Sequence, residues 1–272
     1  MKKVFVPFAI ACLSALTLVS CKKDVKEDAI SSETLNQIQS LGFSTDGVKK
    51  VGADFLVEGD IMLSQKDLQS RPTTPTLLIA SEEQYRTFNL VSASKHPVIK
   101  VALNNSSSQH DAAFSASLDE TIRRYNAENL TVTFQRVTTG ADITVVAFYE
   151  VSNTLGSSGF PTSTGDPYNE VRMNTYWYNT GTDATNTNYI ATIMTHEIGH
   201  CIGFRHTDYM NRAYSCGGRK SNEGQSNTGV GAVLIPGTPS AADPNSFMLA
   251  CIGSNVNRYF NANDKIALAY LY

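Results

Sequence analysis

The chain has 272 residues, which is enough for one large domain or two small ones, and its formal net charge is −3. Hydrophobic residues make up 42% of the chain and charged residues 17%, so a core can form and the surface must rely on Ser, Thr and Asn. Nothing in this balance suggests a nucleic-acid partner, which would favour a basic patch.

The N-terminus is predicted to be a lipoprotein signal peptide over residues 1–20. Lys2 and Lys3 form a basic start, and the apolar run that follows, residues 4–19, is short for a transmembrane helix, which needs about 20 residues. Residues 18–21 resemble the lipobox of bacterial lipoproteins. The resemblance implies cleavage before Cys21, lipidation of Cys21, and a membrane anchor at the bacterial outer membrane or cell surface. An ordinary secretory signal without lipid is the alternative.

Residues 21–95 are predicted to form a tether and a possible pro-region. The sequence favours a short helix over residues 31–42, because a serine can cap its start and Gly42 can end it. A strand is expected over residues 51–63. The Pro-containing stretch 71–75 is typical of an extended linker.

The remaining segment, residues 96–272, is predicted to be a folded domain, which the motif described below would make the catalytic one. Apolar spacing there predicts strands over residues 98–103, 130–137, 141–149 and 171–178, and helices over residues 111–127, 188–202 and 263–271. The aromatic residues 176–178 are expected to pack in the core, with a recognition cluster as the alternative.

The residues with the most specific chemistry lie between positions 195 and 208. His196 and His200 are four residues apart and therefore lie on one face of a helix, one turn apart, where both can hold one ion. A third ligand farther along the same helix would point away, so the chain must turn before His206. Gly203 can take the left-handed conformation that such a turn requires. The alternative is a helix with buried, hydrogen-bonded histidines.

Three imidazoles predict a catalytic zinc site. Three protein ligands leave one tetrahedral position open, and water in that position has its pKa lowered to about 7. Glu197, next to a ligand, can act as the general base that takes the proton from this water and passes it to the leaving amine. Asp208 is a candidate for orienting one of the ligands.

This motif resembles that of the metzincin zinc metalloproteases, and residues 196–200, His-Glu-Ile-Gly-His, spell the signature of the dual-action HEIGH metallopeptidases. The resemblance implies zinc bound by the three histidines and a zinc endopeptidase acting on proteins or peptides. The implied fold is α+β: a twisted mixed sheet with an active-site helix and a backing helix, then a loop-rich lower subdomain with a C-terminal helix. It also implies a methionine turn at Met248, and a substrate-pairing edge strand near residues 156–161. We expect a monomer.

Residues 58–60, Glu-Gly-Asp, resemble a segment of astacin pro-regions. In that family the aspartate occupies the zinc and displaces the catalytic water, so the resemblance implies that Asp60 is an inhibitory ligand of a zymogen. A strand that ends in an ordinary Gly-Asp turn explains the same residues equally well.

Three cysteines remain after Cys12 leaves with the signal and Cys21 is lipidated. An odd number allows at most one disulfide in an oxidising compartment. We favour Cys216–Cys251, which ties the loop after the zinc motif to the segment after the methionine turn, and we expect Cys201 to be a small buried apolar side chain. Three free thiols are the alternative.

Two other functions remain open from the sequence. The first is a non-enzymatic surface lipoprotein that uses this scaffold for binding or adhesion, although an intact Glu197 argues against it. The second is a zinc hydrolase that acts on a non-protein amide or ester.

Overall fold

The computed structural model describes residues 30–69, 84–104, 109–218, 230–239 and 242–272. Its centre is a five-stranded mixed sheet in the order β6-β5-β7-β9-β8. The first four strands are parallel, and β8 runs antiparallel to β9 at one edge. The strands are β5 (Val98–Leu103), β6 (Thr133–Arg136), β7 (Ile143–Phe148), β8 (Gly156–Ser157) and β9 (Glu170–Asn174).

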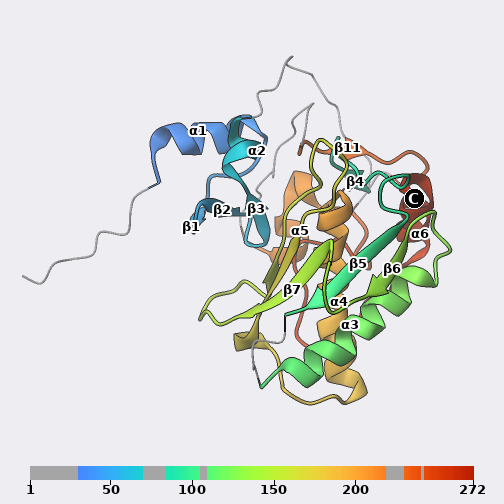
Figure 1. The fold of residues 1–272 in the computed structure, drawn as a ribbon. Helices are drawn as coiled ribbons and strands as arrows, with labels where there is room; N and C mark the ends of the chain where they lie inside the picture. The colour runs from blue at the N-terminus through green and yellow to red at the C-terminus, as the bar shows by residue number, and fades with distance from the viewer. Residues whose placement is uncertain (1–29, 70–83, 105–108, 219–229, 240–241) are drawn as a thin grey trace, which may run out of the picture.

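Two long helices, α3 (Asp111–Asn126) and α4 (Ala184–Ile202), pack against each other and against the sheet (Figure 1). Hydroxyl groups fix their register at four-residue intervals. Ser117, Thr121 and Tyr125 of α3 each donate to a backbone carbonyl of α4, those of residues 187, 191 and 195. The predicted α+β class, with a mixed sheet, an active-site helix and a backing helix, is confirmed.

The N-terminal part forms a small layer of its own, drawn in blue in Figure 1. The strand expected over residues 51–63 is wrong: the chain forms a hairpin, because Glu58 and Gly59 have φ values of 56° and 94° and reverse its direction. Helix α1 ends two residues before the predicted glycine. The elements are α1 (Ser32–Ser40), β1 (Lys49–Val51), β2 (Asp54–Val57), β3 (Ile61–Leu63) and α2 (Gln65–Gln69).

A second small sheet joins distant parts of the chain. Strand β4 (Tyr85–Arg86) lies between β10 (Phe204–Arg205) and β11 (Val233–Leu234) and is antiparallel to both. The segment expected to be tether or pro-region therefore supplies the middle strand beside the zinc motif. A domain boundary at residue 96 stays a prediction.

The C-terminal part is rich in loops and closes with helix α6 (Ala262–Leu271), as predicted. Its start is one residue earlier than expected, because Asn261, rather than residue 263 or 264, caps it with a capping box to Asp264. The other short elements are η1 (Thr175–Trp177), η2 (Tyr209–Asn211) and α5 (Ala213–Cys216).

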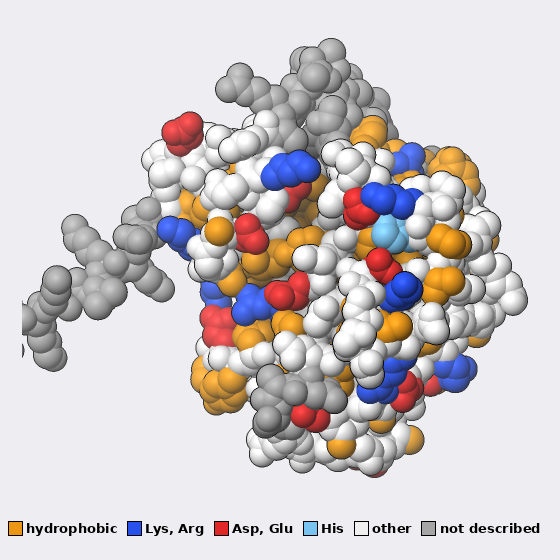
Figure 2. Space-filling view, in the orientation of Figure 1, with side chains coloured by type: hydrophobic (Ala, Val, Ile, Leu, Met, Phe, Trp, Pro, Cys, Tyr) orange, Lys and Arg blue, Asp and Glu red, His pale blue; other side chains and the backbone are white. Residues whose placement is uncertain are grey.

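In the part of the chain that the structure describes, no helix combines the length and the apolar character needed to cross a bilayer. The signal peptide, Cys21 and the linker at residues 71–75 lie outside the described residues. On the face in Figure 2, acidic and basic side chains are interspersed.

Candidate metal centre

Helix α4 carries the first two histidines of the motif. It begins four residues earlier than predicted because the Asp183 carboxylate accepts hydrogen bonds from the N–H groups of Thr185 and Asn186, which caps the helix. It ends at Gly203, whose φ of 113° lies in the left-handed region. A Cβ at Gly203 would lie 2.7 Å from Leu90 Cδ2, so space as well as backbone conformation requires glycine there.

The turn at Gly203 brings the third histidine back to the first two. The Nε2 atoms of His196, His200 and His206 form a triangle with sides of 3.1, 3.2 and 3.3 Å. Tetrahedral zinc with nitrogen ligands at about 2.0–2.1 Å requires ligand atoms roughly 3.3 Å apart. The predicted ligand set therefore fits the geometry of a zinc ion.

The protonation of the imidazoles also fits a metal site. Nδ1 of His196 donates to the Phe247 carbonyl and Nδ1 of His200 to the Phe204 carbonyl, at 2.9 and 2.8 Å, so the lone pairs of Nε2 face one another. Burial and then the neighbouring histidines lower the pKa of His196 to about 4 and that of His200 well below its ordinary value. Neutral imidazoles at His196 and His200, whose Nε2 atoms face the same point as that of His206, are suited to a cation.

Glu197 is held beside this triangle by the edge of the sheet. Ser158 Oγ lies 2.8 Å from Glu197 Oε2, to which it donates. The other oxygen, Oε1, faces Gly156, where a Cβ would lie only 2.8 Å away. Burial and then the charge of Asp60 raise the pKa of Glu197 well above its ordinary range. The carboxylate is thus positioned by one serine and given room by one glycine.

Asp60, at the tip of the β2–β3 hairpin, lies on the same site. Its Oδ2 is 3.1 Å from His206 Nε2 and 3.9 Å from His196 Nε2, and one ligand atom from each of Asp60 and the three histidines falls within a span of 4.8 Å. Burial alone would raise the pKa of Asp60, but His206 and then Arg212 lower it to about 2. The hairpin therefore presents an ionised carboxylate to the metal centre. Its role as an inhibitory ligand stays a prediction.

Met248 packs under helix α4 at Gly199. A Cβ at Gly199 would lie 2.7 Å from Met248 Sδ and 2.9 Å from Phe247 Cε2, so the glycine of the His-Glu-Ile-Gly-His signature allows this close approach. The Met248 carbonyl also accepts a hydrogen bond from the Thr207 N–H, next to the third histidine. The methionine segment thus supports both the helix and the turn after it.

A disulfide joins the loop after the third histidine to the segment after Met248. It links Cys216 to Cys251, the pair favoured from the sequence, while Cys201 is a buried free thiol. Asp208 strengthens the same connection: it accepts hydrogen bonds from the Ala250 N–H and from Ser215 Oγ. Through these hydrogen bonds Asp208 holds the loop after His206 against the segment after Met248, and it does not orient a histidine.

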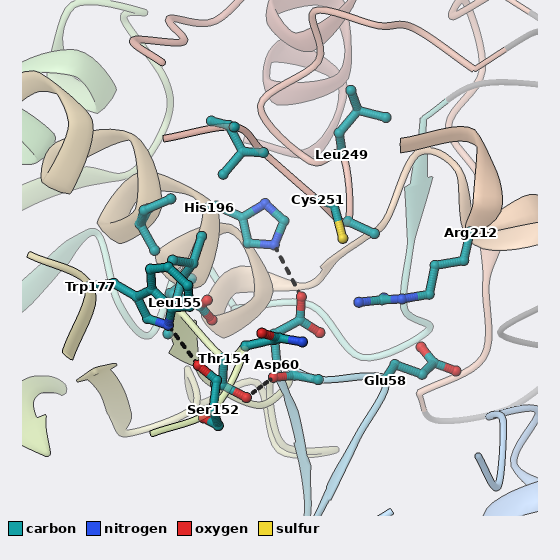
Figure 3. A pocket seen from close by; sticks show the side chains of 18 of the residues that line it. Glu58, Asp60, Ser152, Thr154, Leu155, Trp177, His196, Arg212, Leu249 and Cys251 are labelled. Carbon is teal, nitrogen blue, oxygen red and sulfur yellow. Dashed lines mark hydrogen bonds and ion pairs between the residues drawn. The ribbon is translucent and has the colours of Figure 1, made fainter. Parts of the chain in front are cut away.

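The centre opens into a cleft of about 870 Å³ (Figure 3). One wall is the N-terminal hairpin, and the other consists of residues 151–156 and 249–254. Trp177 lines the cleft and is 37% exposed, and Tyr176 is 44% exposed, so the expectation that residues 176–178 all pack in the core is wrong for these two. The strand that would have buried them ends at Asn174, whose side chain caps a 3-10 turn.

Comparison with known proteins gives a family and a distant structural relative. No curated protein matches the chain. Among solved structures, the chain is similar to that described as "Structure of myroilysin", with 16% sequence identity over 68% of this chain and 95% of the other, and a TM-score of 0.41. The family model of the dual-action HEIGH metallo-peptidases matches residues 55–272, which include the hairpin, the three histidines and the methionine segment. The chain therefore belongs to the dual-action HEIGH metallo-peptidase family.

Proposed function

We propose that this metallopeptidase is a zinc endopeptidase that hydrolyses peptide bonds in extended segments of extracellular or surface proteins, and that Asp60 keeps it latent. The observation that carries the proposal is the triangle of Nε2 atoms, 3.1–3.3 Å apart, with the Glu197 carboxylate in the same cleft. His196, His200 and His206 would hold the zinc ion. When bound, zinc polarises a carbonyl and makes water acidic enough to lose a proton near neutral pH.

Glu197 is the group that moves protons in this reaction. Its Oε2 is engaged by Ser158, so Oε1 remains to take one proton from the attacking water and return it to the nitrogen of the departing amine. A raised pKa suits a carboxyl group that must both accept and donate near neutral pH.

The edge strand β8 and the residue after it supply the backbone groups for an extended substrate. At present the hairpin uses them: Ser158 N–H donates to the Asp60 carbonyl at 2.9 Å, and Met62 N–H donates to the Ser158 carbonyl at 2.7 Å. Substrate that pairs with the same edge would compete with the hairpin for these groups. This shared edge supports latency by occupation of the cleft.

The rest of the N-terminal layer is firmly attached to the catalytic part. Phe160 and Val230 belong to the hydrophobic cluster of this layer, and the Phe43 and Phe160 rings stack with centroids 6.4 Å apart. The Arg205 guanidinium lies over the Phe43 ring at 4.3 Å. Activation therefore requires displacement or proteolytic removal of this layer, and the extended linker predicted at residues 71–75 is a suitable place for the cut.

The proposal also includes the cell envelope as the place of action. The lipobox-like residues 18–21 would attach a monomeric enzyme to the membrane through Cys21, at the outer membrane or cell surface of a bacterium. Labelling with an alkyne fatty acid, with Cys21→Ser as the control, tests the anchor independently of activity.

Incubation of the purified full chain with zinc and a mixed peptide library, followed by mass spectrometry, tests the function. We expect internal cleavages that disappear with a chelator and with Glu197→Gln, while Glu170→Gln, a change of the same kind at the half-buried first residue of β9, leaves them unchanged. Zinc content measured on each variant separates loss of the metal from loss of the base. Equal cleavage by the Glu197→Gln variant would contradict the assigned role.

A further inference from the structure

Arg258 is a cation of the cleft whose side chain has no polar partner among the described residues. Among the described residues that line the cleft, Lys49 pairs with Glu150 at 3.0 Å and Arg212 faces Asp60, as Figure 3 shows. Arg258 lines the same cleft, half-buried, and within the described part of the chain its guanidinium makes neither a hydrogen bond nor an ion pair.

The backbone at Arg258 is fixed to helix α4 beside the metal centre. Its N–H donates to Thr192 Oγ1 at 3.0 Å, and its carbonyl accepts from the buried Arg124 at 3.2 Å. Thr192 lies four residues before His196, so these two side chains share one face of the helix, about 6 Å apart along its axis. Arg258 is therefore anchored one helical turn from a zinc ligand.

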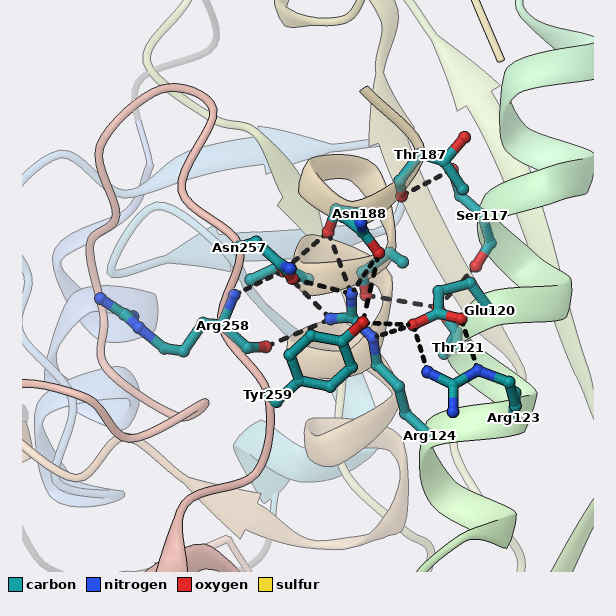
Figure 4. A network of polar contacts seen from close by, with 12 residues as sticks. Ser117, Glu120, Thr121, Arg123, Arg124, Thr187, Asn188, Asn257, Arg258 and Tyr259 are labelled. Carbon is teal, nitrogen blue, oxygen red and sulfur yellow. Dashed lines mark hydrogen bonds and ion pairs between the residues drawn. The ribbon is translucent and has the colours of Figure 1, made fainter. Parts of the chain in front are cut away.

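The Arg258 side chain leaves the network that fixes its backbone. Figure 4 shows it extending away from Arg124, which donates hydrogen bonds to the side chains of Asn188 and Asn257. The floor of the cleft next to it is a stripe of α4, made of Tyr189, Thr192, Ile193 and His196, at the spacing of one helix face.

The carboxylates nearest to Arg258 accept hydrogen bonds from other groups. Asp264 accepts from the N–H groups of Phe247 and Asn261 and from the hydroxyl of Ser246. Asp243 accepts from the side chains of Asn261 and Asn263, and Asp208 from Ala250 and Ser215. Their carboxylates affect Arg258 only at a distance. Desolvation of a cation without a carboxylate is costly, and a ligand that brings one relieves it.

We propose that Arg258 selects substrates with an acidic side chain, Asp or Glu, at one position next to the scissile bond. The inference rests on the proposed endopeptidase function and names its substrate class. Arg258 would act as a specificity residue: its planar guanidinium can donate two parallel hydrogen bonds to a carboxylate, whereas a neutral amide offers it one oxygen. Because the cleft is open to solvent, we expect a moderate preference, about 10- to 100-fold in kcat/KM for Asp over Asn.

The test compares peptides that differ only in Asp against Asn, or Glu against Gln, at each position in turn. The enzyme is the full chain with zinc and the Asp60→Ala change, which clears the metal centre. We expect the preference for acid to be confined to one position beside the cleaved bond, to fall to below about threefold in Arg258→Gln, and to shift toward Lys in Arg258→Glu. A preference that persists in Arg258→Gln, or cleavage without any acidic preference, overturns the proposal.

A binding measurement keeps this test separate from that of the proposed function. In the Asp60→Ala, Glu197→Gln chain, we expect the acidic peptide to bind about 10- to 100-fold more tightly than its amide counterpart, and Arg258→Gln to remove the difference. If no variant cleaves any peptide but this difference is present, the endopeptidase function fails and the acidic site stands. If cleavage occurs and binding shows no difference, the acidic site fails alone. Arg258→Lys should retain part of the preference, which a purely structural role would not predict.

Discussion

Replacement of Asp60 by alanine is the most direct perturbation of the metal centre. The Asp60 carboxylate lies 3.1 Å from His206 Nε2 and would compete with water and substrate for the same corner. A contact that involves a charged group contributes about 1.5–3 kcal/mol, which corresponds to roughly a 10- to 150-fold change in an equilibrium. We therefore expect Asp60→Ala to raise the hydrolysis rate of the full chain by about 10- to 100-fold.

The gain has an upper limit because the hairpin keeps its other contacts. Thr154 Oγ1 still donates to the Gly59 carbonyl at 2.9 Å, and the two backbone hydrogen bonds to Ser158 do not depend on the side chain at position 60. Asp60→Asn, which keeps the shape but loses the charge, should give a smaller gain. Removal of the whole N-terminal layer should give a larger one than either substitution.

The assay is the initial rate on a quenched fluorescent peptide, measured before any self-processing is visible on a gel. Asp46→Ala is the matched control: it removes an equal charge from an exposed residue lining the same cleft, and we expect no change in rate. If Asp60→Ala is no faster than the parent chain, while both lose their activity with Glu197→Gln, then the carboxylate does not restrain the enzyme and the latency argument is refuted.

Three further perturbations test other parts of the molecule. Gly156→Ala places a Cβ 2.8 Å from Oε1 of Glu197, so we expect kcat to fall by at least about tenfold. Zinc content and melting temperature should stay nearly unchanged. An unaltered kcat would mean that the Glu197 carboxylate can move away from the added methyl group without loss of activity. The hydrogen bond from Arg123 is the main cause that lowers the pKa of Glu120 to about 2, so the stabilisation by its carboxylate is fully present above pH 4.5 and is lost as pH falls toward 2. The urea midpoints of the parent chain and of Glu120→Gln should therefore differ at pH 7 and converge toward pH 2. A difference in midpoint that stays constant with pH would contradict this. Cys251→Ser opens a loop that spans a sequence separation of 35, so chemical denaturation should show a loss of about 3–4 kcal/mol, and a loss below about 1 kcal/mol would mean that the hydrogen bonds suffice.

The parts of the site that the sequence predicted are those set by local spacing. His196 and His200 follow from helix periodicity, and the need for a left-handed residue before His206 points to Gly203. The strand over residues 98–103 and the helix that follows were predicted nearly to the residue, because their apolar spacing is regular and no competing turn residues interrupt it.

The parts that the sequence missed depend on contacts between distant segments. Nothing local indicates that Gly156 makes room for Glu197, or that Ser158 holds its carboxylate from 39 residues away. The hairpin turn was missed because Glu58, a residue that rarely adopts positive φ, takes that conformation before Gly59. A Glu-Gly pair between two apolar runs was the available signal.

Trp177 shows a related limit of predicting a strand from the periodicity of its apolar residues. Alternation of apolar side chains indicates a strand, but it does not say where the strand ends. Asn174 ends it by accepting a hydrogen bond from the Tyr176 N–H, and the Trp177 side chain that follows lines the cleft. An asparagine before an aromatic pair is a cap signal that can be read from sequence alone.

The cross-link between residues 216 and 251 couples the hydrolytic centre to the redox state around it. Glutathione in a reducing cytosol would keep both sulfurs as thiols. The loop after His206 would then no longer be covalently bound to the segment after Met248. We expect newly made chains to hold their metal less firmly before oxidation than after it. A covalent bond at the wall of the cleft would thereby help to protect the cell that makes this hydrolase.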